Sequence, residues 1–470
     1  MGILAAQHDP AGVRQLDGLG RAAQAVVRQL LRRSRGWCVV NVGELAPVFF
    51  VAAVVILLFC RLVSYALNRF GQPAVVGEMI AGVLLGPSVF GLLAPGLSER
   101  LFPGELRPVL YVAGQIGVVA LMFHAGYEFR KHAGRGLAAS AIAISAAGVL
   151  VPFVLGLALA LGAKGRVGIF VDGVPLGVTV AFVAVALAIT AFPMLARIIT
   201  ETGISGTRYG SLSLAAGATD DVVAWIMLAG VLSAAAGRAR PIMLAIGGGL
   251  IFVAVLLLVI RRVLGWCLSR PGWNDESRLL VTVAVLFAGA WFTDVIGLYA
   301  VFGAFCVGMA MPRDEAAEHV VHSTHSVTRV IFLPMFFTYS GLQTRFDLFT
   351  EPAVLVFGIA AVAVAVVGKF GGCWLAARLR GEPNSVALRI GALMNARGLM
   401  QLVALNVGLQ AGIVSAELFA ALVLVALVTT TMTVPVLNWL ERREVKSRKL
   451  IEDQVAAGSR RALSAVREDT

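Results

Sequence analysis

The sequence predicts an all-α polytopic membrane protein, and three observations support this prediction. Hydrophobic residues make up 59% of the 470 residues and charged residues only 14%, whereas a soluble domain carries about 25% charged residues. Apolar runs of about 20 residues, long enough to cross a bilayer as helices, recur along the chain. These runs are continuous, unlike the alternating segments of about 10 residues in a membrane β-barrel. The net charge of +12 is explained by basic loops on one side of the membrane, so no nucleic-acid partner is expected.

Thirteen transmembrane helices are expected from the apolar runs, and the lipid bilayer is their solvent. Only Asp294 separates the eighth run from the ninth. The thirteen spans cover residues 45–67, 73–93, 108–127, 137–162, 174–198, 209–234, 240–261, 277–293, 295–312, 327–343, 352–377, 386–411 and 416–439.

The basic residues predict which side of the membrane each end of the chain occupies. An odd number of spans places the termini on opposite sides. The C-terminal tail and the loops on its side hold 23 lysines and arginines, against seven in the opposite loops. The positive-inside rule therefore places the C-terminus in the cytoplasm, and the membrane is expected to be the plasma (inner) membrane.

The chain divides into three predicted parts: a basic arm (1–44), a transmembrane domain (45–440) and a short basic cytoplasmic tail (441–470). The arm has six arginines and would lie outside the cell. It could cross despite its charge, lie on the membrane as an amphipathic segment, or result from a start site placed too early. These three explanations stay open.

Two adjacent acids, Asp220 and Asp221, lie inside the apolar stretch "ATDDVVAWIMLA" (218–229). One carboxylate in mid-membrane costs about 2.5–3.5 kcal/mol, and such residues usually mark ion pathways or proton relays. Neighbouring residues of a helix point about 100° apart, so one acid could meet a fixed cation while the other faces a cavity. A structural pair neutralised by packing or protonation is the alternative.

Two basic residues also lie deep in apolar spans. Lys369, in "VAVVGKFGGCW", needs a partner or a lowered pKa, and one of the two aspartates is the natural candidate. Snorkelling towards the interface is the alternative. Arg397 accompanies Asn395 and Gln401 in "GALMNARGLMQLV". Arginine stays charged when buried, so we expect Arg397 to brace helix ends rather than bind a positive ion.

Two spans carry the signals of broken helices. Pro193 in "LAITAFPMLARII" removes a backbone donor, and Thr190 could help to satisfy the carbonyls that are freed. Span 386–411 is a polar, glycine-containing counterpart. Broken helices at such depth are buried or line cavities and ion sites. A simple proline kink is the alternative. The two spans are the fifth and the twelfth, which are equivalent positions in an inverted repeat of six spans, a connector and six spans.

The chain resembles the monovalent cation:proton antiporter-2 family over residues 45–440. Five stretches in the family order carry this resemblance: "PAVVGEMIAGVLLGPSVFG" (73–91), "ITAFPMLARII" (189–199), "ATDDVVAWIMLA" (218–229), "FLPMFFTYSGLQT" (332–344) and "MNARGLMQLVALNVG" (394–408). The resemblance implies a secondary antiporter that exchanges Na⁺ and/or K⁺ for protons without a cofactor. It also implies a homodimer and two crossing broken helices in a core domain beside a flatter panel.

The resemblance further implies roles for individual residues. Asp221 matches the aspartate that alternately carries cation and proton, and Asp220 matches the position before it; these two and Thr190 are the expected ion- and proton-binding residues. Lys369 matches the lysine that pairs with Asp220. The breaks at Thr190–Pro193 and Asn395–Gly398 would cross near the site, and Glu78 and Arg397 match motif residues of bracing or gating use. Two acids and one lysine imply more protons than cations per cycle, and hence electrogenic transport.

Departures from the family pattern leave ion selectivity open. Gln401 stands where a glutamate is common, and Thr219 stands where apolar residues or asparagine are frequent. His319, His322 and His325 recur at spacing three in a connection between spans; they form either a pH sensor or, on the simpler interpretation, incidental members of a solvated loop.

Two other classes of protein remain as alternatives. A cation-selective, potassium-efflux-like channel would need a continuous pore. An intramembrane aspartyl protease would need one aspartate from each of two helices, whereas these two aspartates are neighbours. The five scattered cysteines indicate neither a disulfide nor a metal site beyond the monovalent cation expected at Asp221.

Overall fold

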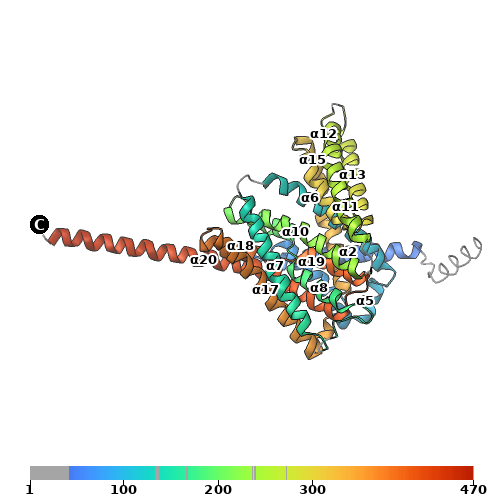
Figure 1. Ribbon diagram of the computed structural model, residues 1–470, viewed down its shortest axis with the longest axis horizontal. Coiled ribbons are helices and arrows are strands. Elements are labelled where there is room, and N and C mark those ends of the chain that lie inside the picture. The colour runs from blue at the N-terminus through green and yellow to red at the C-terminus, as the bar shows by residue number, and fades with distance from the viewer. Residues whose placement is uncertain are drawn as a thin grey trace, which may run out of the picture. The chain divides into compact units, whose positions relative to one another are not determined.

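The computed structural model describes residues 42–468, apart from 133–136, 166–167, 236, 238–239 and 271. All secondary structure within these residues is helical (Figure 1), which confirms the predicted fold class. The helices are α2 (Val42–Asn68), α3 (Ala74–Leu84), α4 (Phe90–Leu93), α5 (Pro95–Leu101), α6 (Leu106–His132), α7 (Ala138–Gly162), α8 (Leu176–Ala188), α9 (Phe192–Glu201), α10 (Arg208–Ala235), α11 (Arg240–Val255), η1 (Leu256–Ile260), α12 (Arg261–Leu268), α13 (Asp275–Val295), α14 (Tyr299–Ala310), α15 (Glu315–Val327), η2 (Thr328–Phe332), α16 (Leu333–Leu342), η3 (Phe346–Thr350), α17 (Pro352–Leu379), α18 (Asn384–Met394), α19 (Gly398–Gln410) and α20 (Ala416–Glu468).

The helices follow the predicted spans. In the part of the chain that the structure describes, nine helices are long and apolar enough to cross a membrane, and α3 and α14 are shorter apolar helices. The other two predicted spans, 327–343 and 386–411, coincide with η2–α16 and with α18–α19. Spans 73–93 and 295–312 were predicted too long. The second begins late because Gly297 and Tyr299 have positive φ angles of 84° and 64°, which stop a right-handed helix.

The predicted termini are only partly described. Residues 1–41 of the basic arm lie outside the described residues, and α2 begins at Val42. At the other end, α20 continues without interruption past the predicted boundary at residue 440. The chain divides into two units, Met1–Ala52 and Ala53–Thr470, and all contacts described below lie within the second.

The fifth and twelfth spans are interrupted, as predicted. The first interruption is Ile189–Ala191, between α8 and α9; the second is Asn395–Arg397, between α18 and α19. Pro193 lies in the first turn of α9 rather than in the gap, where its missing N–H costs nothing. Gly398 opens α19 with φ +44°, and a Cβ there would lie 2.4 Å from Cε of Met194.

Most helices of the Ala53–Thr470 unit pack into two groups. The core group consists of α7, α8, α9, α10, α17, α18, α19 and the membrane part of α20; the panel group consists of α3, α6, α13, α14, α15, η2 and α16. Contacts between the groups are sparser and involve mainly α6, α9, α10, α3 and α20. The core group holds both interrupted spans and both buried aspartates, so the candidate site belongs to it.

Close glycine contacts join α6 to α14 in the panel group. A Cβ on Gly308 would lie 2.0 Å from the carbonyl oxygen of Phe123, and one on Gly126 would lie 2.0 Å from that of Phe305. We expect Gly308→Ala to lower the free energy of unfolding by about 1–3 kcal/mol, because overpacking against backbone forces the helices apart. The thermal unfolding midpoint of purified protein in detergent measures this. Gly162→Ala is the matched control, since nothing lies within 4 Å of its added Cβ; an equal loss in both variants would contradict the prediction.

Candidate ion-binding site

The two adjacent aspartates of α10 are both buried, with 0% and 2% of Asp220 and Asp221 exposed. Oδ2 of Asp220 accepts hydrogen bonds from Nζ of Lys369 at 2.7 Å and from Oγ1 of Thr190 at 2.6 Å. Oδ1 of Asp221 accepts from the backbone N–H of Phe192 at 3.4 Å. The two acids therefore meet different partners, as their angular separation on a helix allows.

Lys369 reaches Asp220 from α17 and is fully buried. Its ammonium also donates to the carbonyl oxygen of Ala188 at 2.7 Å, which is the last residue of α8. One lysine thus neutralises a carboxylate and the partial negative charge at a helix C-terminus. The flanking glycines Gly368 and Gly372 let α17 approach α7, because a Cβ on either would lie within about 3 Å of Pro152 or Ala147.

The two interruptions cross and are bonded to each other. The N–H of Ala191 donates to the carbonyl oxygen of Ala396 at 3.2 Å. The guanidinium of Arg397 donates to the carbonyl oxygens of Ala186 at 3.3 Å, Leu187 and Ala365 at 3.0 Å. Arg397 thus supplies donors to carbonyls near the C-terminal end of α8. A buried polar group without such partners would be costly.

Thr430 of α20 completes the crossing. Its hydroxyl accepts from the N–H of Gly398 at 3.0 Å and of Arg397 at 3.4 Å, and so caps the N-terminus of α19. Sequence reasoning missed Thr430, because "TTTMT" (429–433) in an apolar span gives no signal of its partner. Thr190, for which we expected a role in satisfying freed carbonyls, donates to Asp220 instead; Lys369 and Arg397 donate to the carbonyl oxygens of Ala186, Leu187 and Ala188 at the end of α8.

Several buried oxygen atoms around the crossing have no hydrogen-bond partner within the described residues. They are Oδ1 of Asp220, Oδ2 of Asp221, Oδ1 of Asn395 and Oε1 of Gln401. The amide groups of Asn395 and Gln401 donate to Sδ of Met432 at 3.6 Å and to the carbonyl oxygen of Leu422 at 3.0 Å. Oxygen atoms are the ligands that hard cations prefer. These four oxygen atoms at the crossing could therefore accept a cation or a proton.

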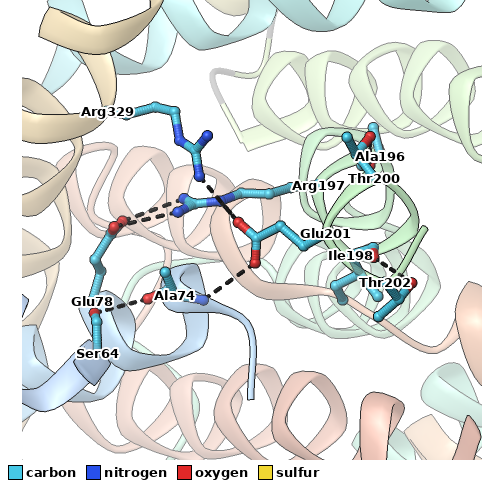
Figure 2. Close-up of polar contacts among 10 residues, drawn as sticks. All are labelled: Ser64, Ala74, Glu78, Ala196, Arg197, Ile198, Thr200, Glu201, Thr202 and Arg329. Atoms are coloured by element: carbon cyan, nitrogen blue, oxygen red, sulfur yellow. Dashed lines mark hydrogen bonds and ion pairs between the residues drawn. The ribbon is translucent and has the colours of Figure 1, made fainter. Parts of the chain in front are cut away.

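Glu78 does not join the aspartates. It lies on α3, and its carboxylate accepts hydrogen bonds from both Nη atoms of Arg197, each at 3.4 Å (Figure 2). Glu201 accepts from Nε of Arg197 at 2.8 Å, Nη2 of Arg329 at 3.0 Å and the N–H of Ala74 at 3.3 Å. We call Glu78, Arg197, Glu201 and Arg329 the charge network. It joins α9 of the core group to α3 and η2 of the panel group.

The three histidines of the predicted connection lie on a helix, α15, and not on a loop as expected. His319 and His322 are exposed and lie 3.5 Å from Asp275 and 3.9 Å from Glu318. His325 is half-buried, and its ring makes a T-shaped contact with that of His124 of α6, with 5.1 Å between the ring centroids. Burial and the nearby Arg329 guanidinium lower the pKa of His325, which favours its neutral form at pH 7.

Buried opposite charges at two crossed, interrupted helices define the protein as a membrane transporter of ions. The sequence model of the family "Sodium/hydrogen exchanger, transmembrane" matches residues 54–440. The chain belongs to that family and is an integral membrane protein. The family resemblance expected from the motifs is confirmed. The protein is therefore a transporter and not an enzyme, and the aspartyl protease alternative is wrong.

Three curated relatives illustrate the family. The chain is 33% identical over 398 residues to "Na(+)/H(+) antiporter NhaS4" of Synechocystis sp., covering 81% of this chain and 94% of that protein. It is 31% identical to "K(+)/H(+) antiporter 1" of Saccharomyces cerevisiae, over 91% of this chain but only 49% of that protein. It is 27% identical to "Na(+)/H(+)-K(+) antiporter GerN" of Bacillus cereus, over 83% of this chain and 96% of that protein. The chain thus spans about half the length of the yeast relative and nearly all of the two bacterial ones.

A solved structure shows the same fold. The sodium proton antiporter MjNhaP1 of Methanocaldococcus jannaschii matches with a TM-score of 0.59, over 85% of this chain and 97% of that chain. The sequences are 13% identical, so this likeness concerns the fold alone.

Proposed function

We propose that the protein is a monovalent cation:proton antiporter that exchanges Na⁺ and/or K⁺ for protons. The names of the relatives, which include Na⁺/H⁺, K⁺/H⁺ and Na⁺/H⁺-K⁺ antiporters, support this activity. The single observation that carries the mechanism is the position of Asp221. Its carboxylate is buried at the N-terminus of α9, and only one of its oxygens has a hydrogen-bond partner within the described residues.

Asp221 is the residue proposed to carry the ion, and Asp220 is its fixed neighbour. Asp220 already has a lysine and a hydroxyl on one oxygen, so its negative charge is compensated. Asp221 receives one long backbone hydrogen bond and the partial positive charge of a helix N-terminus. A carboxylate in this position binds either a proton or a cation, because either one supplies the missing charge. Competition for one carboxylate couples the two fluxes.

The orientation and assembly are part of the proposal. The bias of basic residues supports a cytoplasmic C-terminus, and the plasma (inner) membrane is the membrane proposed. The homodimer is proposed from the family resemblance, with the panel group as the surface that joins the two copies.

Everted membrane vesicles test the activity. After respiration acidifies the lumen, adding Na⁺ or K⁺ should release protons and dequench acridine orange, with each ion and Li⁺ titrated separately at several pH values. An antiporter gives dequenching that saturates with the cation. Cation flux without compulsory proton counter-flux would instead indicate the channel alternative, and neither flux would contradict the proposed function.

Transport is expected to be electrogenic. Asp220, Asp221, Lys369 and Arg397 balance one another when all are charged, and release of a second proton from the Asp220–Lys369 pair would move more protons than cations. Each net charge then gains about 2.3 kcal/mol per 100 mV. A potential imposed with K⁺ and valinomycin, while Na⁺ is the transported ion, should drive or retard exchange. If exchange is independent of the potential, the antiporter is electroneutral and the lysine is structural only.

A further inference from the structure

Two cavities lie at opposite ends of the helices, one where α2 and the panel group meet α9, the other between the panel group and α19. The first, of about 580 Å³, is lined by Glu78, Arg197 and Arg329 beside the charge network. The second, of about 650 Å³, is lined by Asp294 and by residues from α6, α13, α14 and α19. Tyr111 near the start of α6 faces the second cavity, whereas His124 in the last third of α6 contacts His325 beside the first.

The charges lining the two cavities are opposite in kind. Three arginines, Arg61, Arg197 and Arg329, line the cavity at the charge network, together with Glu78, which is paired with Arg197. The lining of the second cavity includes no lysine or arginine among the described residues, and Asp294 is its one charged side chain. Glu201 also pairs with Arg197 and Arg329, so Arg61 is the excess charge at the first cavity, whereas Asp294 makes the second cavity negative. The electrostatic potential therefore favours a cation at the second cavity over the first.

Helix ends and neutral oxygens add to the attraction at the second cavity. α13 ends at Val295, and α19 ends at Gln410, which lines the cavity. Helix C-termini carry partial negative charge. The hydroxyls of Tyr111 and Tyr299 and the amides of Gln115 and Gln410 also line it. Such groups favour a cation that still keeps part of its water shell.

The second cavity extends along α19 towards the crossing. Val403 lines it and lies five residues after Gly398, a distance of about 8 Å along a helix. At the other end, the charge network connects α9 to α3 and η2 through four hydrogen bonds of 3.0–3.4 Å (Figure 2). The charge network therefore holds α9 against α3 and η2 at one end, and the cavity at Asp294 lies at the other end.

We propose that the cavity at Asp294 is the port through which a monovalent cation reaches Asp221, and that Asp294 captures the cation there. This inference rests on the proposed function. Asp294 acts by raising the local cation concentration and does not touch the final binding site. Its removal changes how much cation is needed to saturate transport, not the rate at saturation.

The test compares Asp294→Asn with Asp172→Asn in cation-driven proton release at low ionic strength. Asp172 is an exposed aspartate of the loop between α7 and α8, at the same end of the helices, and it does not line the cavity. We expect Asp294→Asn to raise the apparent KM for Na⁺ or K⁺ about threefold to tenfold, since one charge near a cation in a wet site changes its occupancy by about this factor. The maximal rate should stay within about twofold, and choline chloride should shrink the difference by screening.

Adding the cation to one side of the membrane at a time makes the test more specific. The shift in KM should appear when the cation is added on the Asp294 side, in right-side-out vesicles if the C-terminus is cytoplasmic, and should be absent from the opposite side. An equal shift from both sides, an equal shift in Asp172→Asn, or no shift would overturn the port. Exchange by the parent protein distinguishes failure of the proposed function from failure of the port. If the parent protein does not exchange cations for protons, the proposed function fails. If the parent exchanges and Asp294→Asn has an unchanged KM, only the port is rejected.

Discussion

Asp221→Asn is expected to abolish cation:proton exchange while the protein still folds and inserts. Asparagine has nearly the same shape and can still accept the hydrogen bond that Phe192 donates to Oδ1. It cannot carry a charge or a titrating proton, so the site should bind neither the cation nor the proton. Dequenching of acridine orange by Na⁺ or K⁺ should fall to the background of vesicles that lack the protein.

Asp172→Asn provides the matched control, because it makes the same chemical change at an exposed loop position and should exchange normally. Membrane levels and the elution profile in detergent verify folding of both variants. Robust proton release by Asp221→Asn at normal membrane levels would refute its role as the carrier.

Lys369→Ala is expected to lower the free energy of unfolding by about 3–5 kcal/mol, the usual cost of leaving a buried charge without its partner. In this variant Asp220 retains only Thr190 on Oδ2, and the carbonyl of Ala188 loses the ammonium. Thermal unfolding in detergent, followed by loss of the monodisperse elution peak, measures the change. Lys164→Ala removes an exposed lysine and should leave the midpoint unchanged.

The double variant Asp220→Asn/Lys369→Ala isolates the interaction. With the acid neutralised, the loss of lysine should cost less, so the double variant should be more stable than Lys369→Ala alone. Additive losses would show that the two charges do not stabilise each other despite the 2.7 Å contact between them.

The sequence was sufficient to predict the interruptions and the charged residues near them. Pro193 and Gly398 show their backbone roles locally, and buried Asp220, Asp221 and Lys369 stand out because charge in an apolar span is costly. The length of α14 could not be predicted from hydropathy, because the turn before it is nearly as apolar as the helix, whereas the end of α3 does have a local signal in Gly86 and Pro87. Positive φ at Tyr299 has no local signature.

Contacts between distant segments were also beyond sequence reasoning. Glu201 and Arg329 are 128 positions apart, and each reads as an ordinary charged residue at a span end. The cap from Thr430 to Gly398 and the bond from Ala191 to Ala396 depend on how the helices cross. For the same reason, Thr190 could be placed near the break, but its hydrogen bond to Asp220 could not be predicted.

Helix α9 has a consequence for the thermodynamics of the cycle. Its ten residues form a rod of about 15 Å, with the Phe192 N–H on Asp221 at one end and Arg197 and Glu201 in the charge network at the other. A cation that alters the free energy of separating α9 from α3 must have its own affinity altered by the same factor, because binding linkage is reciprocal. Separation of α9 from α3 at the charge network would therefore change the equilibrium affinity of Asp221 for the ion by the same factor by which ion binding changes the separation equilibrium.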